Sequence, residues 1–277
     1  TDHQAISGVE RVVFIGDSVT VGTPPTPSGD WWRNVVADDL VIRWGLESPG
    51  WDWKNVSLWD GTVYTTESGD FSCCAKWGAR TDDLMLEPHQ QIQTCIPEDA
   101  RDETNLVLMT VGGNDLFNLL EEIRDGGDPA ESEAQWQQAI EHLQDAVHYL
   151  KDSGEFPGGI HLVIANIFDV TDETAALDIA ECTGPEWIGL YDPLLDPLTA
   201  DLAIAWQEEI AALAAETGSD LVFMGEQFCG HGYNYADASG RCYRGGDPNI
   251  WYDLTCMHPS SFGHEAISEM FLATILE

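Results

Sequence analysis

With 277 residues, of which 43% are hydrophobic, the chain is long enough to bury a substantial core, and we expect one domain over residues 1–277. Its 49 Asp and Glu residues against 11 Lys and Arg residues give a formal net charge of -38, which argues against a nucleic-acid partner because phosphate binding requires a basic surface. Since no apolar run of about 18 residues occurs, we also expect no transmembrane segment.

The acidic composition leaves three interpretations open: adaptation to high salt, attraction of cationic material, or a solvated surface without a special role. The screening of crowded carboxylates by salt favours the first. The seven cysteines form no CxxC pair, so we expect disulfides in an oxidising compartment rather than a zinc or redox motif. We predict a secreted protein in its mature form, monomeric and without cofactor or metal.

Short apolar runs alternate with longer amphipathic stretches, which is typical of a parallel sheet covered by helices on both faces. In chain order, we predict strands at Arg11 to Ile15, in the Trp-rich region Asn55 to Trp59, and at Asn105 to Val111, Ile160 to Ile167 and Asp220 to Phe223. Helical periodicity is clearest at Ser132 to Leu150, Leu198 to Ala215 and Phe262 to Leu276.

The last of these helices has a candidate start signal. Ser260 and Ser261 precede its first apolar residue, and serine is a preferred N-cap. The helix should therefore begin just after His258 and Pro259.

Polar residues that directly follow strands carry most weight for function, because ligands of open α/β sheets bind at the carboxyl ends of the strands. The first strand runs into the triplet Gly16-Asp17-Ser18, and the strand that ends near Val111 runs into residues 112–115, Gly-Gly-Asn-Asp. Two further candidates stand in turn-rich sequence, Gly78 and His258.

Taken in chain order, these candidates form four sequence blocks: Gly16 to Ser18, Gly78, Gly112 to Asp115, and His258-Pro259. They resemble, in the same order, the four blocks of the SGNH hydrolase superfamily, which is named for a serine, a glycine, an asparagine and a histidine. The resemblance implies a three-layer α/β/α sandwich with a central parallel sheet of flavodoxin-like type. It also implies hydrolysis of carboxylic esters, with a small-molecule, lipid or acetylated-carbohydrate ester as substrate. The cysteines are most similar to those of the secreted lipases and phospholipases of this superfamily.

The resemblance also implies a role for each block. Ser18 would be the nucleophile and His258 its general base, because an un-ionised serine must lose its proton as it attacks. The oxyanion would be bound by the backbone N–H groups of Ser18 and Gly78 and by the side-chain amide of Asn114. The alternatives are a carbohydrate deacetylase or phospholipase on the same site, or a binding module that has lost turnover.

One block departs from the family pattern. The last block commonly reads Asp-x-x-His, but the position three residues before His258 is Thr255, and the nearest acid is Asp253. Either the backbone carbonyl of Thr255 or the carboxylate of Asp253 would then orient the histidine. The carbonyl is favoured because Thr255 stands three residues before His258, where the family pattern has its acceptor. Asp253 would then have a structural role.

Several other residues have a structural and a functional interpretation. Trp31 and Trp32 follow the loop after Ser18, so they would either belong to the core or line an acyl or sugar pocket. We expect Asp17 and Asp115 to hold turns and His264 to be a packing residue.

Most of the cysteines are expected to be paired, because free thiols in an exported chain would oxidise. Cys95 is expected to join Cys73 or Cys74, which leaves the other as the odd residue. The remaining four are expected to form two bridges around the long final loop: Cys182, Cys229, Cys242 and Cys256.

Overall fold

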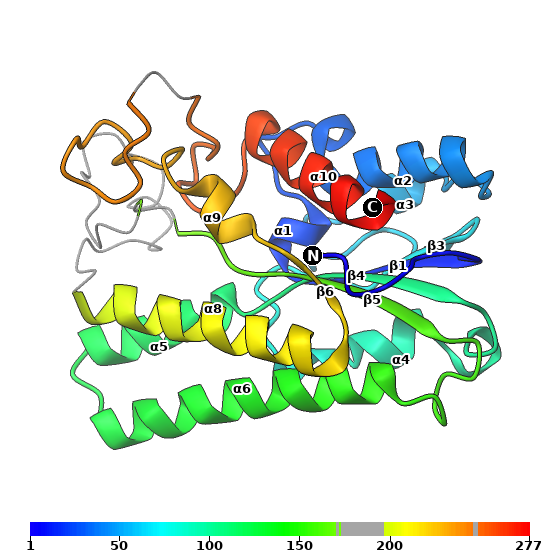
Figure 1. The fold of residues 1–277 in the computed structure, drawn as a ribbon, viewed down its shortest axis with the longest axis horizontal. Coiled ribbons are helices and arrows are strands. Elements are labelled where there is room, and N and C mark those ends of the chain that lie inside the picture. The colour runs from blue at the N-terminus through cyan, green and yellow to red at the C-terminus, as the bar shows by residue number, and fades with distance from the viewer. Residues whose placement is uncertain (170–171, 173–196, 246–248) are drawn as a thin grey trace.

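The computed structural model describes residues 1–169, 172, 197–245 and 249–277. A six-stranded sheet in the order β2-β3-β1-β4-β5-β6 runs through the middle of this part (Figure 1). Neighbouring strands are parallel from β3 to β6, whereas the edge strand β2 pairs with β3 in the antiparallel sense. The strand bounds are β1 Arg11–Gly16, β2 Glu67–Ser68, β3 Phe71–Cys73, β4 Asn105–Thr110, β5 Ile160–Ala165 and β6 Asp220–Val222.

Helices cover both faces of this sheet, as Figure 1 shows, with α2 and α10 on one side and α5, α6 and α8 on the other. The predicted three-layer fold with a central, mostly parallel sheet is therefore confirmed. The helices are α1 Ser18–Val21, α2 Trp32–Trp44, α3 Trp51–Lys54, α4 Gln91–Cys95, α5 Gly113–Arg124, α6 Pro129–Lys151, α8 Pro197–Thr217, α9 Met224–Phe228 and α10 Ser261–Leu276. Short 3-10 turns lie at Ser28–Asp30, Asp82–Leu84 and Glu98–Ala100.

The alternation of side chains along the strands explains why both faces are apolar. In β1, Val13 and Ile15 are buried in the core under α5 and α6, whereas Val12 and Phe14 are buried in the core under α2 and α10. A strand that is covered on both sides therefore reads as a continuous apolar run.

The chain leaves β1 toward the α2 face and leaves β4 toward the α5 face, although the two strands are neighbours (Figure 1). This is the topological switch point, where open α/β sheets bind their ligands. Gly16 ends β1 opposite Thr110 of β4, with a φ of 125°, and an added Cβ would lie 1.8 Å from the Thr110 carbonyl oxygen. Only glycine fits there.

Four of the five predicted strands are confirmed, as β1, β4, β5 and β6. The strand predicted at Asn55 to Trp59 is wrong. Only Val56 pairs there, in an isolated bridge with Val63, because the chain turns back at once through a hydrogen bond from Ser57 N–H to the Thr62 carbonyl (2.7 Å). The partner of β1 on that side is instead β3, whose three residues are too few to show a periodic pattern.

The three predicted helices are confirmed as α6, α8 and α10. Ser260 is the N-cap of α10, and its side chain accepts a hydrogen bond from Gly263 N–H. Among the residues that the structure describes, no helix combines the length and the hydrophobicity needed to cross a bilayer.

Two disulfides are present in the described part of the chain, Cys74–Cys95 and Cys229–Cys242. The first confirms that Cys95 pairs with one of two adjacent cysteines and that the other, Cys73, is free and buried. The choice follows from strand alternation, since Cys73 points into the core under α2, whereas Cys74 packs against the opposite core, which contains Cys95. Of the four cysteines that are expected to form two bridges around the long final loop, Cys182 lies outside the described residues.

Candidate active site

Ser18 lies directly after β1, as the first residue of α1. The residue before it, Asp17, is the N-cap of this helix and accepts a hydrogen bond from Val19 N–H (2.9 Å). The backbone N–H of Asp17 donates to the Thr110 carbonyl (3.0 Å), and the Thr110 hydroxyl donates to the Asp17 carboxylate (3.2 Å). Burial raises the pKa of Asp17 to about 7. These contacts fit the expected turn-holding role of Asp17.

His258 lies in the segment before α10 and reaches Ser18 across 240 residues of sequence. Its Nε2 is 3.0 Å from the Ser18 Oγ, which is hydrogen-bonding distance. Burial lowers the pKa of His258 to about 4. The imidazole is therefore neutral at about pH 7 and able to accept a proton.

The other ring nitrogen of His258 contacts the side chain of Thr255 and not, as we expected, its backbone carbonyl. Nδ1 lies 2.9 Å from the Thr255 Oγ1, and the backbone N–H of His258 donates to the same oxygen (3.1 Å). The Thr255 hydroxyl in turn donates to the Asp253 carboxylate, which also accepts from Thr255 N–H (2.8 Å). A tight turn brings these groups together, since the Asp253 N–H donates to the His258 carbonyl (2.9 Å).

This arrangement changes the expectation for Asp253. Its carboxylate does not contact the histidine directly, but it lies at the end of a chain of hydrogen bonds through Thr255. Burial raises the pKa of Asp253, while the bonds from Thr255 lower it. The sequence signal was the threonine itself, which stands at the position where the family pattern has its acid.

Gly78 belongs to a loop that is tied to both strands of the switch point. Lys76 N–H donates to the Gly16 carbonyl (3.1 Å), and the Asn114 side-chain amide donates to the Ala79 carbonyl (2.9 Å). The loop that contains Gly78 therefore lies at the edge of the sheet where β1 ends and α5 begins. The φ of Gly78 is 74°, which favours glycine.

Asp115 fastens the same loop. Its carboxylate accepts hydrogen bonds from the hydroxyl of Thr81 (2.9 Å) and from the backbone N–H of Thr81 (3.1 Å). Burial raises its pKa to about 6. The contacts agree with the expected role of holding a turn.

Three hydrogen-bond donors remain available at this edge of the sheet. Among the described residues, the backbone N–H groups of Ser18 and Gly78 have no acceptor. The Asn114 amide uses one hydrogen on Ala79 and keeps a second. Donors without an acceptor, beside a serine hydroxyl, are suited to bind an anionic oxygen.

Of the two interpretations of Trp31 and Trp32, the structure supports a place in the core. Their exposed fractions are 3% and 0%. The ring nitrogen of Trp31 donates to the Thr26 carbonyl (3.0 Å), and Trp32 stacks on Phe271 with ring centroids 4.3 Å apart. Both are core residues because α2 turns its first residues toward α10.

Among the tryptophans that the structure describes, the fully exposed one is Trp59, with an exposed fraction of 99%. It stands in the turn between Ser57 and Thr62, and Gly61 of this turn accepts a hydrogen bond from Trp77 N–H (2.9 Å). An added Cβ at Gly61 would lie 2.6 Å from the Trp77 side chain, so the turn packs tightly on the residue before Gly78. The sequence did not distinguish this tryptophan from the buried ones.

His264 is fully buried, and its Nδ1 accepts a hydrogen bond from Trp32 N–H (3.3 Å). Burial lowers its pKa to about 3. The geometry fits the expected packing role. In the described ranges, no three His, Cys, Asp or Glu side chains are placed to hold a metal ion.

The sequence profile of the GDSL-like lipase/acylhydrolase family matches residues 14–266. No match was found among curated protein sequences.

Solved structures of similar fold cover nearly the whole chain. They include a variant of the acetyl xylan esterase Axe2 from Geobacillus stearothermophilus (TM-score 0.54, 16% identity, 98% of this chain and 97% of that chain). The acetyl xylan esterase AlAXEase has a TM-score of 0.53 and 13% identity, over 95% of this chain and 98% of that chain. An extracellular lipase from Streptomyces rimosus has a TM-score of 0.50 and 16% identity, over 96% of this chain and 100% of that chain. At these identities, the likeness concerns the fold.

Proposed function

The chain belongs to the GDSL-like lipase/acylhydrolase family, and from this premise we propose that it hydrolyses carboxylic esters through an acyl-enzyme on Ser18. The observation that carries the proposal is the 3.0 Å contact between the Ser18 Oγ and the His258 Nε2. A neutral imidazole at hydrogen-bonding distance is the arrangement that activates a serine hydroxyl.

The reaction proceeds in two displacements. In the first, His258 takes the hydroxyl proton while the Ser18 Oγ attacks the carbonyl carbon of the ester. The tetrahedral intermediate collapses as the protonated His258 gives this proton to the leaving alcohol. In the second, His258 takes a proton from water as the water oxygen attacks the acyl carbon, and the bond from this carbon to the Ser18 Oγ then breaks as His258 returns the proton to Oγ.

The negative oxygen of each intermediate is stabilised by the three donors at the sheet edge. The N–H groups of Ser18 and Gly78 and the free hydrogen of the Asn114 amide belong to elements anchored to one another. Because they are already oriented, they need little reorganisation when charge develops, and one such donor is worth about 2.7 to 4 kcal/mol.

The Thr255 hydroxyl holds His258 in the required tautomer. Its oxygen accepts the Nδ1–H, and its hydrogen is donated to Asp253. When His258 becomes an imidazolium, the carboxylate of Asp253 stabilises it through this hydroxyl. We therefore propose a Ser18-His258-Thr255-Asp253 chain in place of a directly paired aspartate.

A fluorophosphonate probe tests the proposal. We expect one adduct per chain, and mass spectrometry of the digested protein should place it on Ser18, because the probe mimics the tetrahedral intermediate and traps an activated serine. A protein that stays unlabelled while an unrelated serine esterase reacts in the same buffer would instead support the binding module.

A carbohydrate ester is the second candidate substrate, and the Trp59 turn favours it. The fully exposed indole of Trp59 offers a ligand a large apolar face and a polar N–H. The turn is polar around the ring, since the Thr62 hydroxyl donates to the Asp60 carboxylate (3.1 Å). A flat ring with polar neighbours suits a sugar, which is apolar on one face and carries hydroxyls at its rim.

We expect Trp59→Ala to raise KM for acetylated xylan by about 3- to 10-fold, which corresponds to about 0.5 to 1.5 kcal/mol of aromatic contact. For p-nitrophenyl acetate, kcat and KM should stay within about twofold, because this ester is too small to reach the turn. Initial-rate kinetics on both substrates and on a long-chain p-nitrophenyl ester measure the split, with Ile42→Ala, an exposed apolar residue of α2, as control. If Trp59→Ala raised KM for the long-chain ester alone, the turn would bind an acyl chain and not a sugar.

A further inference from the structure

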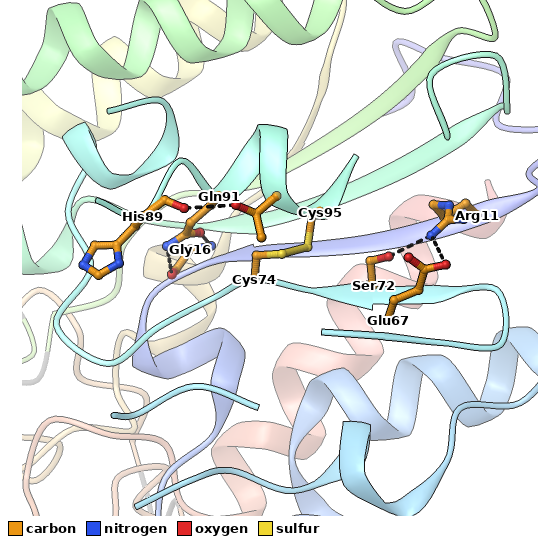
Figure 2. Close-up of a disulfide and its surroundings, with 9 residues drawn as sticks. Arg11, Gly16, Glu67, Ser72, Cys74, His89, Gln91 and Cys95 are labelled. Carbon is orange, nitrogen blue, oxygen red and sulfur yellow. Dashed lines mark hydrogen bonds and ion pairs between the residues drawn. A yellow bond between two sulfur atoms is a disulfide. The ribbon is translucent and has the colours of Figure 1, made fainter. Parts of the chain in front are cut away.

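The side chain of Gln91 makes two hydrogen bonds to a single backbone residue, Gly16 (Figure 2). Its Oε1 accepts from the Gly16 N–H (2.7 Å), and its Nε2 donates to the Gly16 carbonyl (2.9 Å). Gln91 is 1% exposed. Such a pair is the pattern that a peptide group of a neighbouring strand would form.

The side chain stands where the β-ladder stops. The register of β1 with β3 ends at Phe14 and Cys73, and two backbone bonds follow it on that side, from Cys74 N–H to the Phe14 carbonyl (3.0 Å) and from Lys76 N–H to the Gly16 carbonyl (3.1 Å). The Gly16 N–H, two residues further along β1, is bonded to Gln91 instead of to the chain that follows β3. A side-chain amide thus supplies the acceptor for the Gly16 N–H, and a second donor to its carbonyl beside the Lys76 N–H, at the edge of the sheet that holds the candidate active site.

The helix that carries Gln91 is fastened on two sides. In Figure 2, the Cys74–Cys95 disulfide joins the end of α4 to the chain after β3. Ile92, the residue after Gln91, is buried in the core beneath β1 together with Cys95. The amide is therefore held by a helix that is itself anchored.

The two bonds act on the peptide planes that precede Ser18. The N–H of Gly16 belongs to one plane, and its carbonyl shares the next plane with the Asp17 N–H, which donates to the Thr110 carbonyl. Gly16 has no Cβ to restrict its backbone, so other conformations are open to it. Gln91 and the Lys76 N–H on one side and Thr110 on the other hold this peptide in a single orientation, and the Gly16 N–H that precedes it is held by Gln91.

We propose that Gln91 is a positioning residue that aligns the Ser18 hydroxyl with His258 by locking the backbone of Gly16. The inference rests on the proposed function of Ser18. Its physical basis is that attack on a carbonyl requires near-ideal alignment, so a small displacement of the nucleophile lowers the rate without weakening substrate binding.

The test compares Gln91→Leu with a matched control, Asn105→Leu. Asn105 is also a fully buried amide, and it donates to the carbonyls of Ala100 (3.1 Å) and Glu103 (2.8 Å), but it lies at the start of β4, at the opposite edge of the sheet. We expect Gln91→Leu to lower both kcat and the rate of fluorophosphonate labelling at least tenfold, with KM within about twofold. Asn105→Leu should lower the melting temperature and leave both rates within about twofold.

A second variant, Gln91→Glu, keeps the shape and changes only the donor. A neutral carboxylic acid accepts and donates like the amide, but a carboxylate cannot donate to the Gly16 carbonyl. The activity of this variant relative to the natural protein should therefore rise as the pH falls from about 8 to about 5, toward the ordinary pKa of glutamate. A purely structural role predicts a constant ratio wherever both proteins remain folded.

Amide hydrogen exchange at Gly16 is a readout that needs no turnover. We expect exchange at this amide to be at least tenfold faster in Gln91→Leu and unchanged in Asn105→Leu. Equal loss of rate in both variants, or unchanged rates and a flat pH ratio for Gln91→Glu, would overturn the proposal. A natural protein that no probe labels would refute the proposed function instead, and unchanged exchange at Gly16 would then separately refute the locking role of Gln91.

Discussion

We expect Ser18→Ala and His258→Ala each to lower kcat for ester hydrolysis by about 10⁶-fold, and the double variant to be no slower than either single one. In the proposed mechanism the two side chains act as one unit, because the proton moves across the 3.0 Å contact between Oγ and Nε2. Without the hydroxyl there is no acyl-enzyme, and without the imidazole the hydroxyl stays protonated. A residual rate of about 10³- to 10⁴-fold over water should persist, because the oxyanion donors are untouched.

Steady-state kinetics on p-nitrophenyl acetate measure these losses, and circular dichroism checks that the variants remain folded. His148→Ala is a suitable control, since this histidine lies on α6 and pairs with Glu216 of α8 (3.4 Å), on the face away from His258. Its kcat should stay within about twofold. A Ser18→Ala variant that retains a tenth of the activity would refute the assignment of the nucleophile.

The second large effect is expected at Thr255. Valine has the shape of threonine, but it offers no acceptor to the Nδ1–H of His258 and breaks the connection to Asp253. We expect Thr255→Val to lower kcat by about 10³-fold, and Asp253→Asn by about 10²-fold. Both are smaller than the roughly 10⁴-fold loss for an aspartate that touches its histidine, because the carboxylate here acts through a hydroxyl.

Two reciprocal variants sharpen this test. Thr255→Ser keeps the hydroxyl, so its kcat should stay within about tenfold of that of the natural protein. Thr255→Asp creates the Asp-x-x-His spacing, so it should remain active and make a further Asp253→Asn change nearly silent. If Thr255→Val stayed within tenfold, another acceptor, such as a main-chain carbonyl, would have to orient His258.

The fold could be predicted in outline because its signals are local. A strand covered on both faces is an apolar run, and a helix over a sheet repeats every three to four residues, so β1, β4, β5 and α6 can be recognised from short windows. The candidate residues Ser18 and Asn114 follow such strands directly. The position after a parallel strand is the place where ligands bind, whatever the rest of the chain does.

Burial of the aromatic residues could not be predicted in the same way. Trp31, Trp32 and Trp59 lie in similar Trp-rich sequence, yet the first two are in the core and the third is fully exposed. An indole is apolar enough for the interior and amphipathic enough for a binding surface. Which of the two it occupies depends on which element packs above it, here α10 against α2.

The sequence by itself therefore determined the fold class, the four blocks and the identity of Ser18 and His258 as candidates. Only the tertiary structure decided what holds them. The amide of Gln91 meets Gly16 across 75 residues, and the side chain of Thr255, rather than its carbonyl, meets His258 through a turn. The physical reason is that periodicity and turn chemistry act over a few residues, whereas a hydrogen bond between distant segments depends on the path of the whole chain and on which rotamer its packing allows.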